Sequence, residues 1–201
     1  MRKSYNHKKK VPFYKKKQFF TIMIAVFFVM LMALSAVNLG QNNEEDDASS
    51  NAFEAYGLTF VQSSNGYEAE LSDGSVLSLI YDPSQLDDVG DASIVGSLAS
   101  FVYVEKVYLS SDLNASNLDY ALYDFQRNVA LPSSVSLACY EEGELCEDLP
   151  LKTCEDASES VGVIVWKEAE ETSVSLVDNC LTIEGKNLLK VTDKLLIENY
   201  G

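Results

Sequence analysis

The stretch that decides the predicted fold is residues 101–140, FVYVEKVYLSSDLNASNLDYALYDFQRNVALPSSVSLACY. Phe101–Leu109 is rich in β-branched and aromatic residues, which favours a strand. Apolar residues then recur at three- and four-residue spacing from Leu118 to Val129, the pattern of an amphipathic helix. Val135–Tyr140 predicts a second strand. Because short links join these elements, we expect a βαβ unit with parallel strands and a right-handed crossover.

An antiparallel meander is expected on the N-terminal side of this unit. Its three predicted strands are Leu58–Gln62, Tyr67–Leu71 and Val76–Tyr81. An Asn-Gly pair at residues 65–66 marks the first turn, because these residues favour the positive φ that tight hairpins need. Pro83 suits the first turn of a short helix, and the pattern of residues 84–100 does not distinguish one structure from another.

The C-terminal part adds three strands and a second helix. The strands are Val161–Lys167, Ser173–Val177 and Cys180–Glu184, and the helix carries an apolar stripe from Leu188 to Leu196. The predicted fold class is therefore α/β or α+β. It has a mixed β-sheet with at least one βαβ unit and two amphipathic helices, preceded by one N-terminal transmembrane helix.

Charge divides the chain into two opposite regions. Residues 1–40 carry eight Lys and Arg and no acid, whereas the rest holds all 31 acidic residues and only seven bases, a net charge of −24. Between them, residues 19–39 (FFTIMIAVFFVMLMALSAVNL) contain no charge and no proline. Twenty-one helical residues extend about 30 Å, the thickness of the bilayer's hydrocarbon core, and basic residues stay on the cytoplasmic side.

Four regions follow from this division. We expect a basic cytoplasmic tail at 1–18, a transmembrane signal anchor at 19–39, a flexible acidic stalk at 40–54 and an extracytoplasmic domain at 55–201. Two alternatives remain open. A signal peptidase could cut near Ala36, or a pilin-like leader could be cut at Lys17, although Lys17 and Ile22 depart from the pattern of that family.

Four cysteines, Cys139, Cys146, Cys154 and Cys180, all lie in the expected external domain. An even number of cysteines in an oxidising compartment predicts disulfides. Of the three possible pairings we favour Cys139–Cys146 and Cys154–Cys180. A zinc site is the alternative, but the sequence has no C-x-x-C pair and the external region has no histidine.

Several kinds of chemistry are disfavoured by what the sequence lacks. The only histidine, His7, is in the basic tail, so a Ser-His-Asp or Cys-His catalytic site is not expected in the external domain. No phosphate-binding glycine loop or EF-hand pattern is present, and the acidic charge disfavours nucleic acid. We therefore assign no catalytic, cofactor-binding or metal-binding residue and identify no small-molecule ligand.

Two surface features are candidates for a function. The densest acidic patch is either a solvated loop or a site for a cation or a basic partner; it comprises Glu141, Glu142, Glu144, Glu147 and Asp148. Asn114-Ala115-Ser116 is an N-glycosylation sequon on an expected loop, so Asn114 would carry a glycan where the host has the machinery.

The order of strands and helices, the placing of the cysteines and the terminal helix resemble small single-pass anchored extracytoplasmic proteins of archaea. The resemblance covers residues 55–201 and includes no diagnostic motif, so it assigns no functional residue. It implies an uncharacterised, membrane-anchored binding or structural protein at the cell surface, with a protein partner. The alternatives are a surface hydrolase that depends on carboxylates or a divalent ion, and a pilin-like filament subunit.

Overall fold

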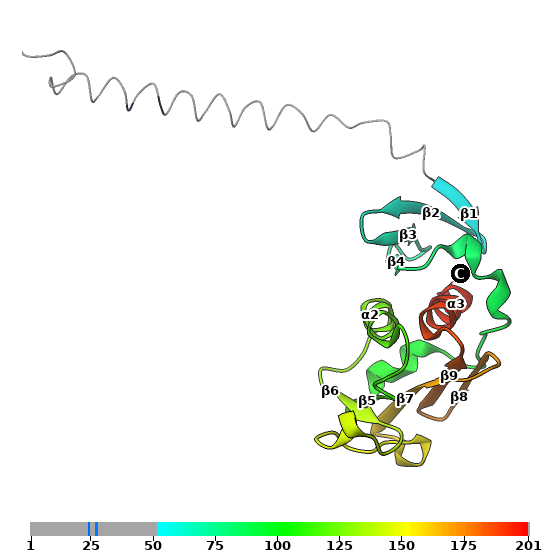
Figure 1. Ribbon diagram of the computed structural model, residues 1–201. Coiled ribbons are helices and arrows are strands. Elements are labelled where there is room, and N and C mark those ends of the chain that lie inside the picture. The colour runs from blue at the N-terminus through cyan, green and yellow to red at the C-terminus, as the bar shows by residue number, and fades with distance from the viewer. Residues whose placement is uncertain (1–23, 25–26, 28–51, 201) are drawn as a thin grey trace, which may run out of the picture. The chain divides into compact units, whose positions relative to one another are not determined.

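The N-terminal part of the folded domain is a four-stranded antiparallel sheet (Figure 1). The computed structural model describes Ile24, Phe27 and residues 52–200. The strands follow one another in the order β1-β2-β3-β4 and are β1 (Ala52–Ala55), β2 (Leu58–Ser63), β3 (Gly66–Glu70) and β4 (Val76–Leu79). The meander is confirmed, but β1 begins three residues before the expected start of the domain.

A positive-φ turn joins β1 to β2 and explains why β1 escaped the sequence analysis. Tyr56 (φ 53°) and Gly57 (φ 78°) both lie in the left-handed region that a two-residue hairpin requires. A tyrosine is costly there. Its hydroxyl is held by Asp87, to which it donates at 2.5 Å, and by Lys194 Nζ at 3.0 Å. Tertiary contacts therefore stabilise a turn that the local sequence does not favour.

The C-terminal part is a five-stranded mixed sheet with strand order β6-β5-β7-β9-β8. All neighbours are parallel except β8 and β9. Its elements are β5 (Lys106–Ser111), α2 (Leu118–Asn128), β6 (Val135–Cys139), β7 (Val161–Glu168), β8 (Ser173–Val177), β9 (Cys180–Gly185) and α3 (Leu188–Tyr200). The predicted βαβ unit is confirmed as β5-α2-β6. The expectation of one mixed sheet is wrong, because the meander forms a sheet of its own.

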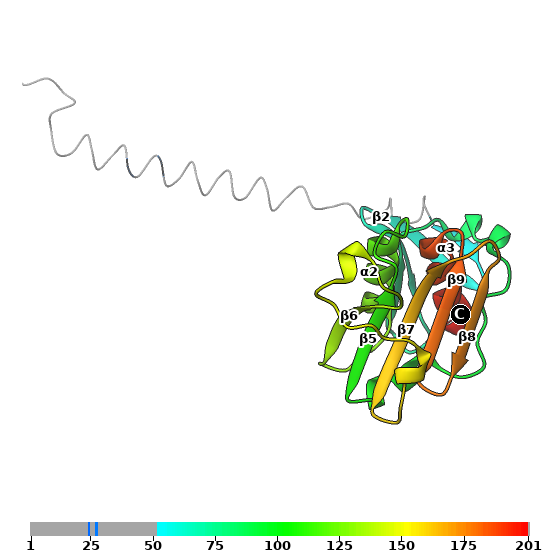
Figure 2. The same ribbon diagram turned by 60° about the horizontal axis from the view of Figure 1, so that its bottom comes forward.

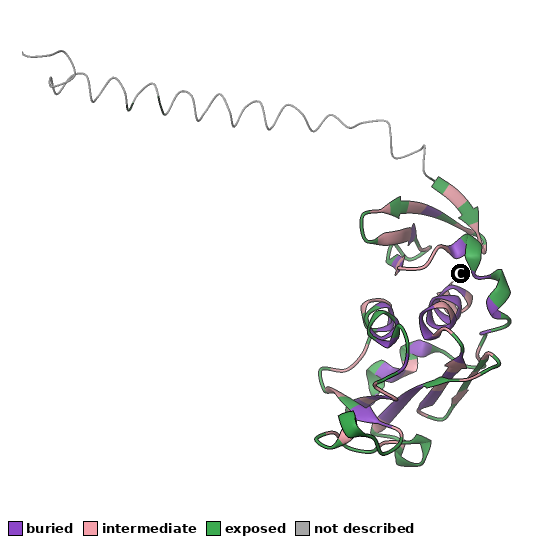
Figure 3. Cartoon of the chain, viewed as in Figure 1, coloured by how far each residue is buried: buried purple, intermediate pink, exposed green. Residues whose placement is uncertain are grey.

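Helices α2 and α3 lie side by side between the two sheets (Figure 1), and buried residues lie on both helices and on the five-stranded sheet (Figure 3). One apolar core joins all three layers and includes Phe60 from the first sheet, Leu195 from α3 and Trp166 from the second sheet. Trp166 packs edge-to-face on Phe125 of α2, with ring centroids 5.3 Å apart. The domain is thus a sheet–helix–sheet sandwich, consistent with an α+β fold.

The predicted strand Phe101–Leu109 is wrong in its first half. A 3-10 helix covers Leu98–Tyr103, and the strand begins only at Lys106. The reason is the Phe101 side chain, which is fully buried and lies so close to Gly162 of β7 that a Cβ at Gly162 would meet its ring at 2.8 Å. Tertiary packing overrides strand propensity here.

Two shorter 3-10 helices, Pro83–Gln85 and Asp87–Val89, precede this one in the segment that the sequence left ambiguous. The first confirms the helix predicted at Pro83. Its start is fixed by Asp82, whose carboxylate accepts the backbone N–H of Ser84 at 2.9 Å.

The far face of the five-stranded sheet is covered by the segment between β6 and β7, which crosses in front of the strands in Figure 2. It contains two more 3-10 helices, Glu144–Cys146 and Cys154–Asp156. Both predicted disulfides are present, with Cα–Cα distances of 6.0 Å for Cys139–Cys146 and 5.3 Å for Cys154–Cys180. We call the first the short-range disulfide and the second the long-range disulfide.

The expected tail, most of the transmembrane helix and most of the stalk lie outside the described residues. Ile24 and Phe27 of the 19–39 segment are described, and both are helical. Among the residues that the structure describes, no helix has the length and apolar character needed to cross a membrane.

Candidate functional site

The carboxyl ends of the parallel strands lie along one edge of the five-stranded sheet. Because β5, β6, β7 and β9 run in the same direction, the loops that follow them lie along the same edge of the sheet. Open α/β sheets bind their ligands outside this edge. Between β5 and β7 the edge is closed by a hydrogen bond of 2.7 Å from the Ser116 N–H to Glu168. Two hollows flank this closure, one beyond β9 and one beyond β6.

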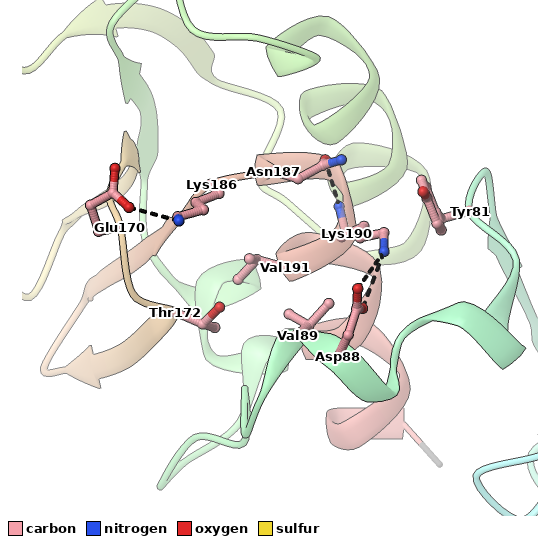
Figure 4. Close-up of a pocket in the computed structure, with 9 residues that line it drawn as sticks. All are labelled: Tyr81, Asp88, Val89, Glu170, Thr172, Lys186, Asn187, Lys190 and Val191. Atoms are coloured by element: carbon pink, nitrogen blue, oxygen red, sulfur yellow. Dashed lines mark hydrogen bonds and ion pairs between the residues drawn. The ribbon is translucent and has the colours of Figure 1, made fainter.

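The first hollow, which we call the α3 groove, lies where β9 leads into α3 and encloses about 480 Å³ (Figure 4). Asn187 starts the helix by accepting the Lys190 N–H at 3.2 Å. Two of the seven bases of the acidic region, Lys186 and Lys190, project into it. It is lined by Tyr81, Asp88, Val89, Glu170, Thr172, Lys186, Asn187, Lys190 and Val191.

Acids in the α3 groove already neutralise both lysines. Lys186 lies 2.7 Å from Glu170, and that contact lowers the pKa of the Glu170 carboxyl. Lys190 lies 3.1 Å from Asp88 and stacks over the ring of Tyr81. Burial alone would lower the pKa of Lys190, but its bonds to Asp88 and Tyr81 outweigh burial and raise it. An anionic ligand would have to displace these carboxylates.

The second hollow, which we call the loop hollow, lies beyond β6 and encloses about 610 Å³. It is lined by Glu142, Gly143, Glu144, Cys146, Glu147, Leu149 and Leu151. Its apolar lining is accessible, since the Leu151 side chain is 44% exposed, and the neighbouring Leu145 is 57% exposed. The hollow thus combines leucines with three carboxylates, a composition suited to a peptide segment rather than to a small apolar molecule.

Backbone hydrogen bonds and the short-range disulfide fix the loop hollow to the sheet. The Cys139 N–H donates to Pro150 O at 3.0 Å, and the Lys152 N–H donates to Cys139 O at 2.8 Å. This forms a parallel bridge between Cys139 and Leu151 beside strand β6. The chain therefore leaves the sheet at Cys139 and returns beside the same residue, so both ends of the acidic loop are anchored.

Three of the five acids of the predicted patch, Glu142, Glu144 and Glu147, line the loop hollow. Glu141 instead accepts a hydrogen bond of 3.0 Å from the hydroxyl of Tyr140. Burial and this carboxylate together raise the pKa of Tyr140 to about 12. Among the described residues, no group of three or more His, Cys, Asp or Glu side chains is placed to hold a metal ion.

Asn114 lies exposed on the loop between β5 and α2, as the sequon requires. Its backbone N–H donates to Asp112 at 2.9 Å, and its side-chain amide lies 3.3 Å from the same oxygen. The amide nitrogen therefore has one weak contact at the surface and is accessible to modification.

A pair of buried carboxyl groups was not foreseen. Asp124 of α2 and Asp193 of α3 are both fully buried. Asp124 accepts the Ile80 N–H at 2.7 Å, and Asp193 accepts the Tyr81 N–H at 2.8 Å. They thereby tie the chain that follows β4 to both helices. In the sequence, Asp124 lies outside the apolar stripe that runs through Leu122 and Phe125, so the helical pattern does not identify the pair.

Burial of two neighbouring carboxyl groups favours the protonated form of one of them. Burial raises the pKa of Asp193 well above its usual range, and the neighbouring Asp124 raises it further. Burial also raises the pKa of Asp124. The hydrogen bonds of Asp124 and the nearby Arg127, whose Nη2 lies 2.7 Å from Oδ1, oppose this rise. We therefore assign the proton to Asp193 and the negative charge to Asp124. Because neither side chain reaches solvent, their role is structural.

Comparison with known proteins adds no further guidance, because no family model, curated protein or solved structure matches the chain.

Proposed function

We propose that the protein is a membrane-anchored, extracytoplasmic binding protein. Residues 19–39 would hold it in the membrane with residues 1–18 in the cytoplasm, and the domain at 52–200 would bind a protein partner outside. The placement of the domain is supported by its disulfides, because all four of its cysteines are paired and such bonds persist in oxidising compartments.

The observation that carries the binding role is the loop hollow. Single exposed apolar side chains are ordinary on protein surfaces, so the informative feature is a group of them at a concave site. Leu145 and Leu151 are held exposed on a loop that is anchored at both ends. Exposed leucines around a hollow are typical of surfaces that another molecule covers.

The structure offers less for the hydrolase alternative. Such an enzyme needs carboxyl groups with altered pKa values in a cleft that substrate can enter. The two acids with the most perturbed surroundings, Asp124 and Asp193, are sealed in the core and already bind backbone N–H groups. Reaching them would require separating β4 from both helices.

Site-specific photo-crosslinking of the full-length protein in its native membrane tests this proposal. A crosslinker replacing Leu145 is expected to give one discrete protein adduct. The matched control replaces Val76, an exposed apolar residue on the four-stranded sheet, and is expected to give none. The intact mass of the same sample reports whether residues 19–39 are retained. Recovery of uncrosslinked protein alone from both positions would refute the binding role, and a mass matching cleavage near Ala36 or Lys17 would refute the anchor.

A further inference from the structure

We propose that the loop hollow receives a basic, apolar peptide segment of the partner protein. An apolar side chain of that segment would rest on Leu149 and Leu151, and its lysines or arginines would face Glu142, Glu144 and Glu147. This inference rests on the proposed binding function and adds the chemistry of the partner to it.

The shape of the hollow exists before any partner arrives. Within its wall, the Cys146 N–H donates to Gly143 O at 2.9 Å and the Leu149 N–H donates to Cys146 O at 3.1 Å. The short-range disulfide closes the same wall onto β6. A surface that is already ordered loses little conformational entropy on binding, so a short segment can bind with useful affinity.

The apolar part of the hollow requires an apolar partner residue. Leu151 lines the hollow and is 44% exposed, and Leu145, which lies in the chain between the lining residues Glu144 and Cys146, is 57% exposed. A purely ionic ligand would leave these side chains in water and would not account for their exposure. An aliphatic or aromatic side chain with a volume well below 610 Å³ fits the space.

The charged part of the hollow selects a basic segment. Residues 140–149, YEEGELCEDL, contain five acids and no base. The next base along the chain, Lys152, is engaged by Asp156 at 2.7 Å and lies over the ring of Tyr108. Charge complementarity therefore favours a cationic segment, whereas a second copy of this acidic domain would be repelled.

A designed probe peptide tests the chemistry directly. The probe is a fluorescein-labelled nonapeptide of alternating lysine and leucine (KLKLKLKLK), titrated against the full chain in lipid nanodiscs and measured by fluorescence anisotropy. Two control peptides keep only one feature each: KSKSKSKSK keeps the charge, and SLSLSLSLS keeps the leucines. We expect the probe to bind at least about tenfold more tightly than either control, because both parts of the hollow contribute.

Matched variants locate the site. The triple variant E142Q, E144Q, E147Q is expected to weaken probe binding by about tenfold, the sum of three rim ion pairs. The control triple E155Q, E159Q, E171Q removes the same charge from exposed positions elsewhere and is expected to change binding by less than about threefold. The fluorescence of the single buried tryptophan, Trp166, checks that every variant is folded.

The inference and the proposed function fail in different ways. Equal weakening by both triple variants would show binding to the acidic surface in general and would overturn the inference, as would equal affinity for KSKSKSKSK. Crosslinking at Leu145 with a partner segment that is neutral or acidic would also overturn it while leaving the binding function intact. Absence of any crosslinked partner would overturn the proposed function itself.

Discussion

Replacing Asp193 with asparagine should remove a specific loss of stability that the wild-type domain suffers as the pH rises. Asp193 is fully buried, and its pKa in the folded state lies well above the usual value near 3.8. The folded protein therefore keeps a proton that the unfolded chain releases. Such a group contributes stability that is fully present below the unfolded pKa and is lost as the pH rises through the folded pKa.

The expected magnitude follows from one retained proton. Between the unfolded and folded pKa values, the free energy of unfolding falls by about 1.4 kcal/mol for each pH unit. The asparagine variant has no proton to lose at this position. Its Oδ1 can still accept the Tyr81 N–H, and its amide can donate to Asp124 as the protonated acid does. Relative to the wild type, the variant should gain about 1.4 kcal/mol per pH unit from pH 4 up to the raised pKa of Asp193.

Urea unfolding between pH 4 and pH 8, followed by fluorescence, measures this difference. Trp166 is the single tryptophan, is fully buried, and donates its indole N–H to Thr192 at 3.1 Å, so its emission reports on the core. Loss of any negative charge relieves repulsion in so acidic a domain. The control is therefore E159Q, which removes an exposed carboxylate and so measures the effect of a lost negative charge alone.

Two outcomes would refute this reasoning. A wild-type and a D193N protein with parallel pH profiles would show that Asp193 does not hold the proton. The companion variant D124N should be destabilised by about 3 kcal/mol, because it leaves Arg127 without the carboxylate at 2.7 Å. If D124N were as stable as D193N at pH 7, the charge would be assigned to the wrong member of the pair.

Three further predictions concern the covalent and backbone constraints. Replacing both cysteines of the long-range disulfide by alanine should lower the free energy of unfolding by about 3.5 kcal/mol, and the same change in the short-range disulfide by about 2.5 kcal/mol. The difference arises because the two loops span 26 and seven residues, respectively. Urea unfolding that gave the reverse order would contradict the argument. Gly66→Ala should lower the free energy of unfolding by at least about 3 kcal/mol, because its Cβ would lie 2.0 Å from Leu79 O. Gly74→Ala has no atom within 4 Å of its Cβ and should lower it by only about 1 kcal/mol, the cost of its positive φ. Thermal unfolding measures both changes. In a host that glycosylates asparagine, the peptide containing Asn114 should carry a glycan that N114Q and S116A both abolish, and an unmodified wild-type peptide would rule the site out.

Local signals were sufficient for the elements whose stability is itself local. The α2 helix, β6 and the second half of the predicted strand before α2 follow from apolar spacing and β propensity within 40 residues. The pairing of the cysteines was also predicted, since it joins Cys139 and Cys146 across a short loop and leaves Cys154 for Cys180. The sequence gives no comparable sign of which strands share a sheet, since pairing depends on contacts between distant segments.

The three-layer arrangement has one signal that could have been used. Nine of the ten α3 residues from Leu188 to Ile197 are buried, including Asp193 and Lys194. A helix that is buried nearly all round must pack against structure on two sides. The run LLKVTDKLLI is therefore more consistent with a helix between two sheets than with a helix on the outside of one.

Burial also explains why the acid pair and the loop hollow could not be assigned in advance. Asp124 and Asp193 are 69 residues apart, and no local pattern pairs them. The hollow depends on the hydrogen bonds that bring Leu151 back beside Cys139, which the disulfide alone does not require. In both cases the sequence shows the residue types, but tertiary structure determines which residues lie next to them.

The loop hollow is difficult to explain by folding alone. Ordering a loop costs roughly 1–2 kcal/mol of backbone entropy per residue, and exposed leucines recover little of it through burial. A loop that served only solubility could keep its five acids without leucines and without the bridge to Cys139. The ordered combination of exposed leucines and uncompensated carboxylates is instead what a partner surface with the opposite charge and an apolar residue would require. This is why the proposed function rests on this loop rather than on the α3 groove, where each lysine already has its own acid.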